Sequence, residues 1–154
     1  MPTRPSDERP APLLRLLGLT TQGLAGELHR RLAEAGFDDQ RGADDAVMAH
    51  IPPEGIRLTS LAQRAGVSKQ AMGELVDSLV ARDYVERIPD PTDGRAKLLV
   101  FSERGWASVD TALGALADIE AELVAELGDR RIQSLRKALD LVLTGYLRDT
   151  TPGP

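Results

Sequence analysis

Apolar residues recur every three or four positions over most of the chain, a spacing typical of amphipathic helices. In the first long segment the repeating residue is leucine, and Gly36 follows it as a plausible helix end. Near the end of the chain, Gly128 separates two further segments with the same spacing. The pattern predicts four helices, over residues 13–35, 43–50, 103–127 and 130–148.

Two shorter periodic segments, separated by a tight turn, occupy the middle of the chain. Residues 60–65 predict a short helix, in which Ser60 and Gln63 fit a capping box. A three-residue turn with Gly66 at its centre follows, and Ser68 is a natural N-cap for a second helix. That helix has one apolar face (Met72, Leu75, Val76, Leu79) and one polar face (Lys69, Gln70, Gly73, Glu74, Asp77). Together these segments predict a helix-turn-helix.

A β-hairpin is predicted immediately after the second helix. The β-favouring runs 84–88 and 98–101 enclose a charged turn, "DPTDGRAK" (residues 90–97). Pro91 and Gly94 are both expected in the turn itself. A helix-turn-helix followed by a hairpin is a winged helix. The expected fold is therefore mainly α with a small β-hairpin wing, a winged helix-turn-helix attached to a helical dimerisation lobe.

The composition excludes several classes of protein. The chain has 154 residues, 42% hydrophobic and 28% charged, which predicts a soluble globular protein. No apolar run approaches the length of about 18 residues that a membrane helix needs, and the first twelve residues lack the apolar core of a signal peptide. Cysteine is absent, which excludes disulfides and thiolate metal sites and fits a cytoplasmic location.

Charge is unevenly distributed along the sequence. The formal net charge is −5, which by itself argues against a nucleic-acid partner. Residues 56–97, however, contain seven basic and six acidic side chains, so this segment has a small positive charge. Local sign and geometry matter more to phosphate binding than the total, so the net charge does not exclude double-stranded DNA as a partner.

The second helix of the helix-turn-helix is long enough to lie in a DNA major groove. Gln70 near its start can pair with adenine, Glu74 can accept from cytosine, and Gly73 allows a close backbone approach. Thr59 and Ser60 can bond phosphate. The alternative is that these residues form the solvated face of a core helix. The predicted DNA-binding residues are Thr59, Ser60, Arg64, Ser68, Lys69, Gln70, Gly73, Glu74, Arg87, Asp93, Arg95 and Lys97.

Four of these residues, Arg87, Asp93, Arg95 and Lys97, belong to the predicted wing. A hairpin beside a groove-bound helix lies near the adjacent minor groove, where an inserted arginine reads groove width. Arg95 is the candidate, and Asp93 is expected to hold its guanidinium. Arg87 and Lys97 are expected nearer the phosphates. The alternative is a surface Arg–Asp pair worth less than about 1 kcal/mol.

Three motifs within residues 57–105 resemble the winged-helix core of MarR-family transcriptional regulators. They are the "LA…GVSKQA" helix-turn-helix, the D-x-R-x-K wing (Asp93, Arg95, Lys97) and the Ser-Glu-x-Gly opening of the next helix (Ser102, Glu103, Gly105). The resemblance implies an obligate homodimer, most often a repressor, on a pseudo-palindromic operator. It also implies that a small phenolic or lipophilic effector can bind between lobe and wing and weaken DNA binding.

The resemblance also divides the chain. A winged helix-turn-helix over residues 43–102 would be flanked by a dimerisation lobe built from 13–36 and 103–148, with tails at 1–12 and 149–154. His50 and Trp106 are candidate residues of an effector pocket, and Trp106 is expected to be largely core. The candidate dimerisation residues are Leu13, Leu17, Leu135, Leu139, Val142, Leu143 and Tyr146. The alternative is that these helices pack only within one chain.

Enzyme function is not expected. His29 and His50 are the only histidines, neither has a metal-ligand partner at helical spacing, and His29 is expected on the surface. No Gly-rich phosphate loop or nucleophile elbow is present, and no cofactor is predicted. The alternative function is a winged-helix dimerisation or protein-interaction module without DNA binding. Such a module would precede a catalytic domain with a nucleotide loop, which these 154 residues do not contain.

Overall fold

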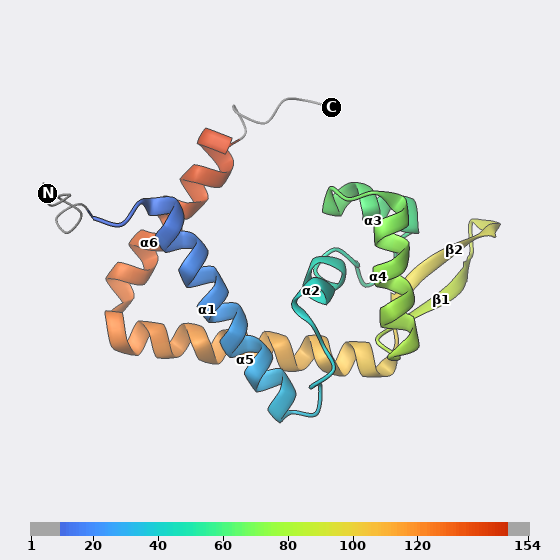
Figure 1. Cartoon of the computed structure of the whole chain (residues 1–154), viewed down its shortest axis with the longest axis horizontal. Helices are drawn as coiled ribbons and strands as arrows, with labels where there is room; N and C mark the ends of the chain where they lie inside the picture. Colours follow the sequence, from blue (N-terminus) through green and yellow to red (C-terminus); the bar gives the residue numbers. More distant parts are fainter. Residues whose placement is uncertain (1–9, 148–154) are drawn as a thin grey trace, which may run out of the picture. The chain divides into compact units, whose positions relative to one another are not determined.

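The computed structural model describes residues 10–147 of the chain (Figure 1). Its elements are α1 (Leu13–Glu34), α2 (Gly42–Met48), α3 (Leu58–Ala65), α4 (Lys69–Ala81), β1 (Val85–Asp90), β2 (Asp93–Phe101), α5 (Glu103–Leu127), α6 (Asp129–Leu141) and a π-helical turn η1 (Val142–Tyr146). The predicted fold class is confirmed. Most of residues 1–12, all of 149–154 and the last residue of the helix predicted to reach 148 lie outside the described residues.

Helix α2 is shorter than the sequence pattern predicts. It ends at Met48 rather than His50, and the backbone N–H of His50 bonds the Val47 carbonyl in a tight final turn at 3.1 Å. The cause is Pro52, which disfavours the helical conformation at Ile51 and so brings the helix to an early end.

The described residues divide into two compact units, the first ending at Leu113 and the second beginning at Gly114. The first unit contains the main hydrophobic core, which joins α2, α3, α4 and the hairpin. Its buried members are Val47, Met48, Ile51, Ile56, Leu61, Ala62, Met72, Val76, Leu79, Tyr84, Val85, Leu99 and Phe101. Three of these are the predicted apolar face of α4, whose fourth member, Leu75, packs against the core while partly buried. One face of α4 is therefore fixed and the opposite face is left for solvent or a ligand.

The turn between α3 and α4 has the geometry that its sequence predicts. Gly66 adopts a left-handed conformation with φ of 67°, which a glycine tolerates at no steric cost. The Ser68 side chain then caps α4 by accepting from the Ala71 N–H at 3.1 Å. The capping box predicted for Ser60 is wrong. Helix α3 begins two residues earlier, at Leu58, with Arg57 as its N-cap and no side-chain capping bond.

The hairpin is longer than predicted and its turn is tighter. Regular pairing extends from Val85 opposite Phe101 to Pro89 opposite Lys97, and Asp90 then pairs with Asp93. The turn is therefore Pro91 and Thr92 alone. Gly94, which the sequence places in the turn, lies in β2 instead. Between the last two pairs β2 has three extra residues, 94–96, which have no partner on β1.

Helix α5 begins against the backbone of the hairpin. The Ser102 side chain accepts from the Gly105 N–H at 3.0 Å and donates a short bond to the Asp83 carbonyl. At Gly105 a Cβ atom would lie 2.0 Å from the carbonyl oxygen of Tyr84 and 3.2 Å from the ring of Phe101. The Ser-Glu-x-Gly motif therefore has a structural role, since it lets α5 pack directly on the start of the wing.

A charged cluster connects the end of α4 with α2 and with the loop after α1. Arg82 donates two bonds of 2.8 Å to Asp44, whose side chain is 3% exposed. Burial raises the pKa of Asp44, but bonds from Arg82 and from a backbone N–H outweigh it and keep the pKa below its usual value. Arg104 and the Tyr84 hydroxyl both donate to Asp39, at 2.9 and 2.6 Å. Burial and this bond raise the pKa of Tyr84 to about 12.

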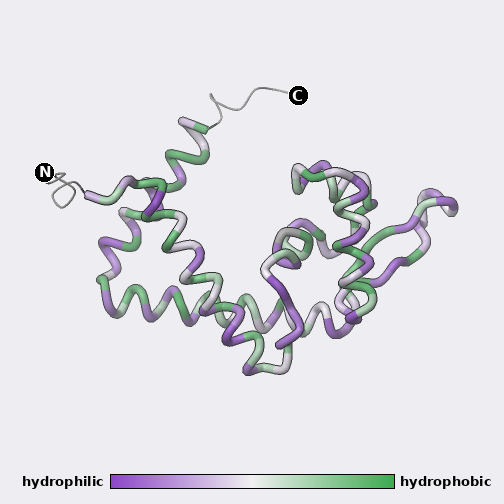
Figure 2. Tube along the Cα trace, in the orientation of Figure 1, coloured by the Kyte–Doolittle hydropathy of each residue, from purple (hydrophilic) through white to green (hydrophobic). Residues whose placement is uncertain are grey.

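The second unit contains the end of α5, α6 and η1. Ile119 of α5 and Ile132 of α6 are buried, and an Arg136–Glu120 ion pair also joins the two helices. Hydrophobic residues recur along these helices (Figure 2), and many of them are exposed. Leu135, Leu139, Leu141, Val142 and Leu143 are between 36% and 69% exposed. A single copy of this unit therefore leaves these five apolar side chains largely accessible to solvent.

Candidate nucleic-acid interface

The outward face of α4 is polar and accessible. Lys69, Gln70, Glu74 and Asp77 are exposed and Gly73 is partly buried, as the sequence predicts. Gln70 and Glu74 are at most weakly coupled to each other, with 3.5 Å between Nε2 and Oε1. Lys69 makes no ion pair with any residue that the structure describes. Both its charge and the amide of Gln70 are therefore available to a ligand.

The first turn of α3 presents a second set of polar groups. Thr59 and Ser60 are exposed in this turn, where backbone N–H groups have no partner within the helix. Such a helix start attracts anions through its N–H groups and its dipole. Arg64 is one turn after Ser60 and is also exposed. The hydroxyl of Ser68 differs from these groups, because the N-cap bond already uses it as an acceptor.

The hairpin extends beside α4, and its closed end projects beyond the helices of the first unit (Figure 1). Arg95 lies near that end, in the part of β2 that is unpaired with β1. The sequence suggests that Asp93 holds the guanidinium of Arg95, but the structure shows no such bond. Asp93 accepts from the backbone N–H of Arg95 at 3.2 Å instead. Across the described part of the chain, the Arg95 guanidinium has no hydrogen bond or ion pair, so its charge faces solvent.

Two other basic residues of the wing have different surroundings. Lys97 is exposed opposite Pro89 and forms no ion pair within residues 10–147. Arg87 lies 2.5 Å from the carboxylate of Asp77. This pair joins β1 to the polar face of α4, and it offsets part of the positive charge that Arg87 would offer a phosphate.

A pair that sequence reasoning missed connects the closed end of the wing to α3. Arg57 donates from Nε to Asp90 at 2.7 Å, and its Nη2 lies 2.5 Å from the same carboxylate. Thr92 donates to the other oxygen of Asp90 from its backbone N–H at 2.8 Å and from its hydroxyl at 2.6 Å. Asp93 lies 3.8 Å from Arg57 on the exposed side. No local pattern reveals this pair, because its partners are 33 residues apart.

These bonds keep Asp90 ionised. Donation from the Thr92 hydroxyl, from the Thr92 N–H and from Arg57 lowers the pKa of Asp90 to about 2. A carboxyl with a depressed pKa stabilises the folded state fully above its unfolded pKa of about 4. That contribution is lost only as the pH falls through about 2, so the pair stays charged in neutral solution.

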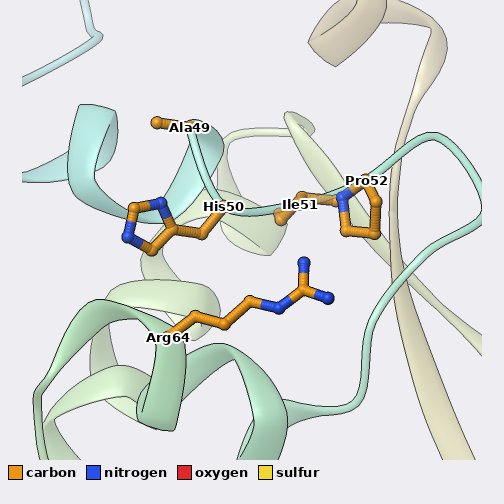
Figure 3. Close-up of a pocket in the computed structure, with 5 residues that line it drawn as sticks. All are labelled: Ala49, His50, Ile51, Pro52 and Arg64. Atoms are coloured by element: carbon orange, nitrogen blue, oxygen red, sulfur yellow. The ribbon is translucent and has the colours of Figure 1, made fainter. Parts of the chain in front are cut away.

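A hollow of about 400 Å³ lies where α2 leads into α3, lined by Ala49, His50, Ile51, Pro52 and Arg64. In Figure 3 the Arg64 side chain extends below Ile51 and Pro52, and the His50 ring lies to the left of it. Trp106 does not line it. That residue is 38% exposed and packs edge-on against Phe101 with ring centroids 5.0 Å apart, so it is less buried than expected. The structure therefore brings His50 together with Arg64 rather than with Trp106.

His29, expected on the surface, is partly buried, with 24% of its side chain exposed. Its Nδ1 lies 2.9 Å from the Ala25 carbonyl oxygen, and its Nε2 lies 3.3 Å from a carboxylate oxygen of Asp45. The two histidines of the chain thus have separate surroundings, and no group of three acidic or histidine side chains in residues 10–147 is placed to hold a metal. Within the same range no helix is both long and apolar enough to cross a membrane.

The sequence and the fold are similar to those of known proteins. Residues 46–96 match the sequence model of the MarR family. An HTH-type transcriptional regulator of Mycobacterium bovis is 37% identical over 93 residues, which cover 60% of this chain and 64% of that protein. A regulator of Mycobacterium leprae is 33% identical over 54% of this chain and 59% of its own length. The chain thus spans less than two thirds of each of these relatives.

A solved structure extends the similarity to most of the chain. A mutant of MarR from E. coli complexed with operator DNA superimposes with a TM-score of 0.67 at 27% identity, over 86% of this chain and 94% of that one. The two mycobacterial relatives are described as HTH-type transcriptional regulators.

Proposed function

We propose that this chain, whose residues 46–96 match the MarR family, is a transcriptional regulator that binds double-stranded DNA as a homodimer. Helix α4 enters the major groove and Arg95 of the wing enters the adjacent minor groove. Two copies related by a two-fold axis recognise a pseudo-palindromic operator, with half-sites about one helical turn apart.

One observation supports this proposal above the others. The polar face of α4 is exposed beside a hairpin whose Arg95 guanidinium has no partner among the described residues. The neighbouring guanidinium groups of Arg87 and Arg57 are paired with Asp77 and Asp90, so Arg95 differs from both. An unpaired guanidinium at the closed end of a wing suits insertion into a minor groove, where the negative potential is strong.

The test begins by selecting bound fragments from random or genomic DNA with the purified protein. An enriched palindromic motif supports the proposal, and Arg95→Ala is then expected to bind that motif at least about tenfold more weakly, a loss of about 1.4 kcal/mol. Gel shift or fluorescence anisotropy measures the change, while circular dichroism and sedimentation verify fold and dimer. Unchanged binding by Arg95→Ala would remove the wing from the interface.

The dimer is supported by apolar side chains that one chain leaves exposed. Leu13 and Leu143 are 67% and 62% exposed, and Leu17 is half-buried. The rest of the expected interface, Leu135, Leu139, Val142 and Tyr146, is also exposed. Large apolar side chains left exposed in such number on a globular protein usually mark an interface. A dimer centred on α6 and η1, with α1 contributing, covers these side chains.

Repression and a response to a small molecule complete the proposal. Binding to a promoter-proximal palindrome would exclude polymerase, which is the simplest consequence of a dimer on DNA. The hollow around His50 offers apolar walls from Ile51 and Pro52 beside the cationic Arg64. These groups suit an ionised phenol or an aromatic carboxylate, whose binding would favour one dimer conformation over another. Release of the selected DNA by a hydroxybenzoate, lost in Arg64→Gln, would support this role.

The alternative function, a winged-helix interaction module without DNA binding, is tested by the same selection. It predicts no enriched motif at any salt concentration. It also leaves the unpaired guanidinium of Arg95 without a role.

A further inference from the structure

The closed end of the wing is fastened to the helix-turn-helix by an ion pair whose acid is buried. The Asp90 side chain is only 5% exposed, although it stands beside the two-residue turn of a projecting hairpin. The Arg57 side chain is 42% exposed, so the pair joins a buried carboxylate to a partly solvated guanidinium. An acid at a hairpin turn normally points to solvent, and this burial therefore requires a specific reason.

The bonds to Asp90 account for both of its oxygens. One oxygen accepts from Arg57, at the N-cap of α3, and the other accepts twice from Thr92 in the turn. The carboxylate thus connects the turn to the first helix of the helix-turn-helix. A second contact adds to this connection, because the chain segment before Arg57 forms an isolated bridge between Ile56 and Leu99 of β2.

Arg95 lies in β2, shortly after the turn that Asp90 connects to α3. The Asp93 side chain accepts from the Arg95 backbone N–H and lies 3.8 Å from Arg57. The carboxylates of Asp90 and Asp93 therefore hold the backbone on both sides of the turn, while the guanidinium of Arg95 remains free within the described residues. The backbone that carries Arg95 is ordered by bonds to Asp90 and Asp93, not by any bond to the guanidinium itself.

We infer that Arg57 and Asp90 form a clamp that fixes the wing relative to α3 and α4, so that Arg95 is placed for the minor groove before DNA arrives. Arg57 is then a positioning residue for DNA binding, not a phosphate contact. This inference rests on the proposed function. Preorganisation of this kind strengthens binding because less ordering is left to be done when the complex forms.

The decisive variant is Asp90→Asn, because the two interpretations of Arg57 predict opposite signs. If Arg57 contacts phosphate directly, removing its acidic partner releases a positive charge and should tighten binding. If Arg57 acts through the clamp, Asp90→Asn should weaken binding to the selected operator at least about fivefold, although the protein has lost a negative charge. Fluorescence anisotropy with a labelled operator measures either change.

A matched control removes the same charge elsewhere on the wing. Glu86 is exposed on β1 and makes no hydrogen bond or ion pair with any residue the structure describes. Glu86→Gln is therefore expected to bind the operator as tightly as the wild type or slightly more tightly. Arg57→Lys provides a second clamp variant if Asp90→Asn fails to fold. It retains the charge but loses the two-bond geometry, so it too should weaken binding.

A double-mutant cycle separates the clamp from general destabilisation. If the clamp acts through Arg95, then Asp90→Asn should cost less than twofold in an Arg95→Ala background. Additive losses, or binding by Asp90→Asn at least as tight as that of Glu86→Gln, would overturn the clamp while leaving the proposed function intact. A wild-type protein that binds no DNA would overturn the proposed function, and the clamp with it.

Discussion

Arg95 and Gln70 are the residues proposed to read the minor and the major groove, respectively. Both could be selected from the sequence, since one occupies a recognisable wing motif and the other follows a serine N-cap. Their surroundings could not be predicted. Asp93 bonds the backbone of Arg95 rather than its guanidinium, a distinction that depends on the path of the turn. Arg57 and Asp90 were not singled out, because no periodicity relates residues 33 positions apart.

The side-chain amide of Gln70 is expected to read bases. Gln70→Ala should cost about 1–3 kcal/mol at particular base pairs of the selected operator, because a bidentate pair with adenine is lost there. Binding to a set of single-base variants of the operator measures this selectivity. A uniform loss across all variants would identify Gln70 as a phosphate contact. Lys69→Ala is the matched comparison, expected to weaken all variants alike and to reduce the salt dependence.

Elements were predicted well where a local signal sets their ends. Gly66 and Ser68 define the turn between α3 and α4, and both are legible in the sequence. The start of α3 was wrong by two residues because Ile56 pairs with Leu99, a contact between distant segments that fixes the chain just before the helix. The start of α5 illustrates the same limit, since the role of Gly105 becomes visible only when Tyr84 packs against it.

Two glycines of α5 are expected to respond oppositely to alanine. At Gly105 a new Cβ would lie 2.0 Å from the Tyr84 carbonyl oxygen, so Gly105→Ala should destabilise the fold by about 1–3 kcal/mol. Gly114 in the same helix has no heavy atom within 4 Å of the added Cβ. Gly114→Ala should therefore stabilise by about 0.5–1 kcal/mol through helix propensity. Urea unfolding measures both, and equal effects would contradict the close packing at Gly105.

At the scale of the whole molecule, the sequence indicated a dimer interface but not which side chains of each helix would be exposed to form it. Leucine periodicity identified α1 and α6 as apolar, and their exposure in one chain then argues for a partner copy. The division of the chain at residue 113 could not be predicted, because α5 is one continuous helix whose two ends pack in different units.

The proposed dimer predicts a specific weakness in α6. Leu135→Asp should raise the dimer dissociation constant at least about tenfold, because it buries an unpaired charge in the interface. Ser134→Asp adds the same charge at the neighbouring position, which is polar and exposed, and should leave the dimer intact. Analytical ultracentrifugation over a concentration series measures both. Equal dissociation of the two variants would indicate that α6 lies outside the interface.

Trp106 is the sole tryptophan of the sequence, and it rests on Phe101, the last residue of the wing. Its indole is partly open to water, so its emission is sensitive to polarity and to the position of that ring. Excitation at wavelengths that tryptophan alone absorbs therefore reports on the base of the wing, where Trp106 packs. The molecule contains its own optical reporter, and wing movement can be followed in real time without any attached dye.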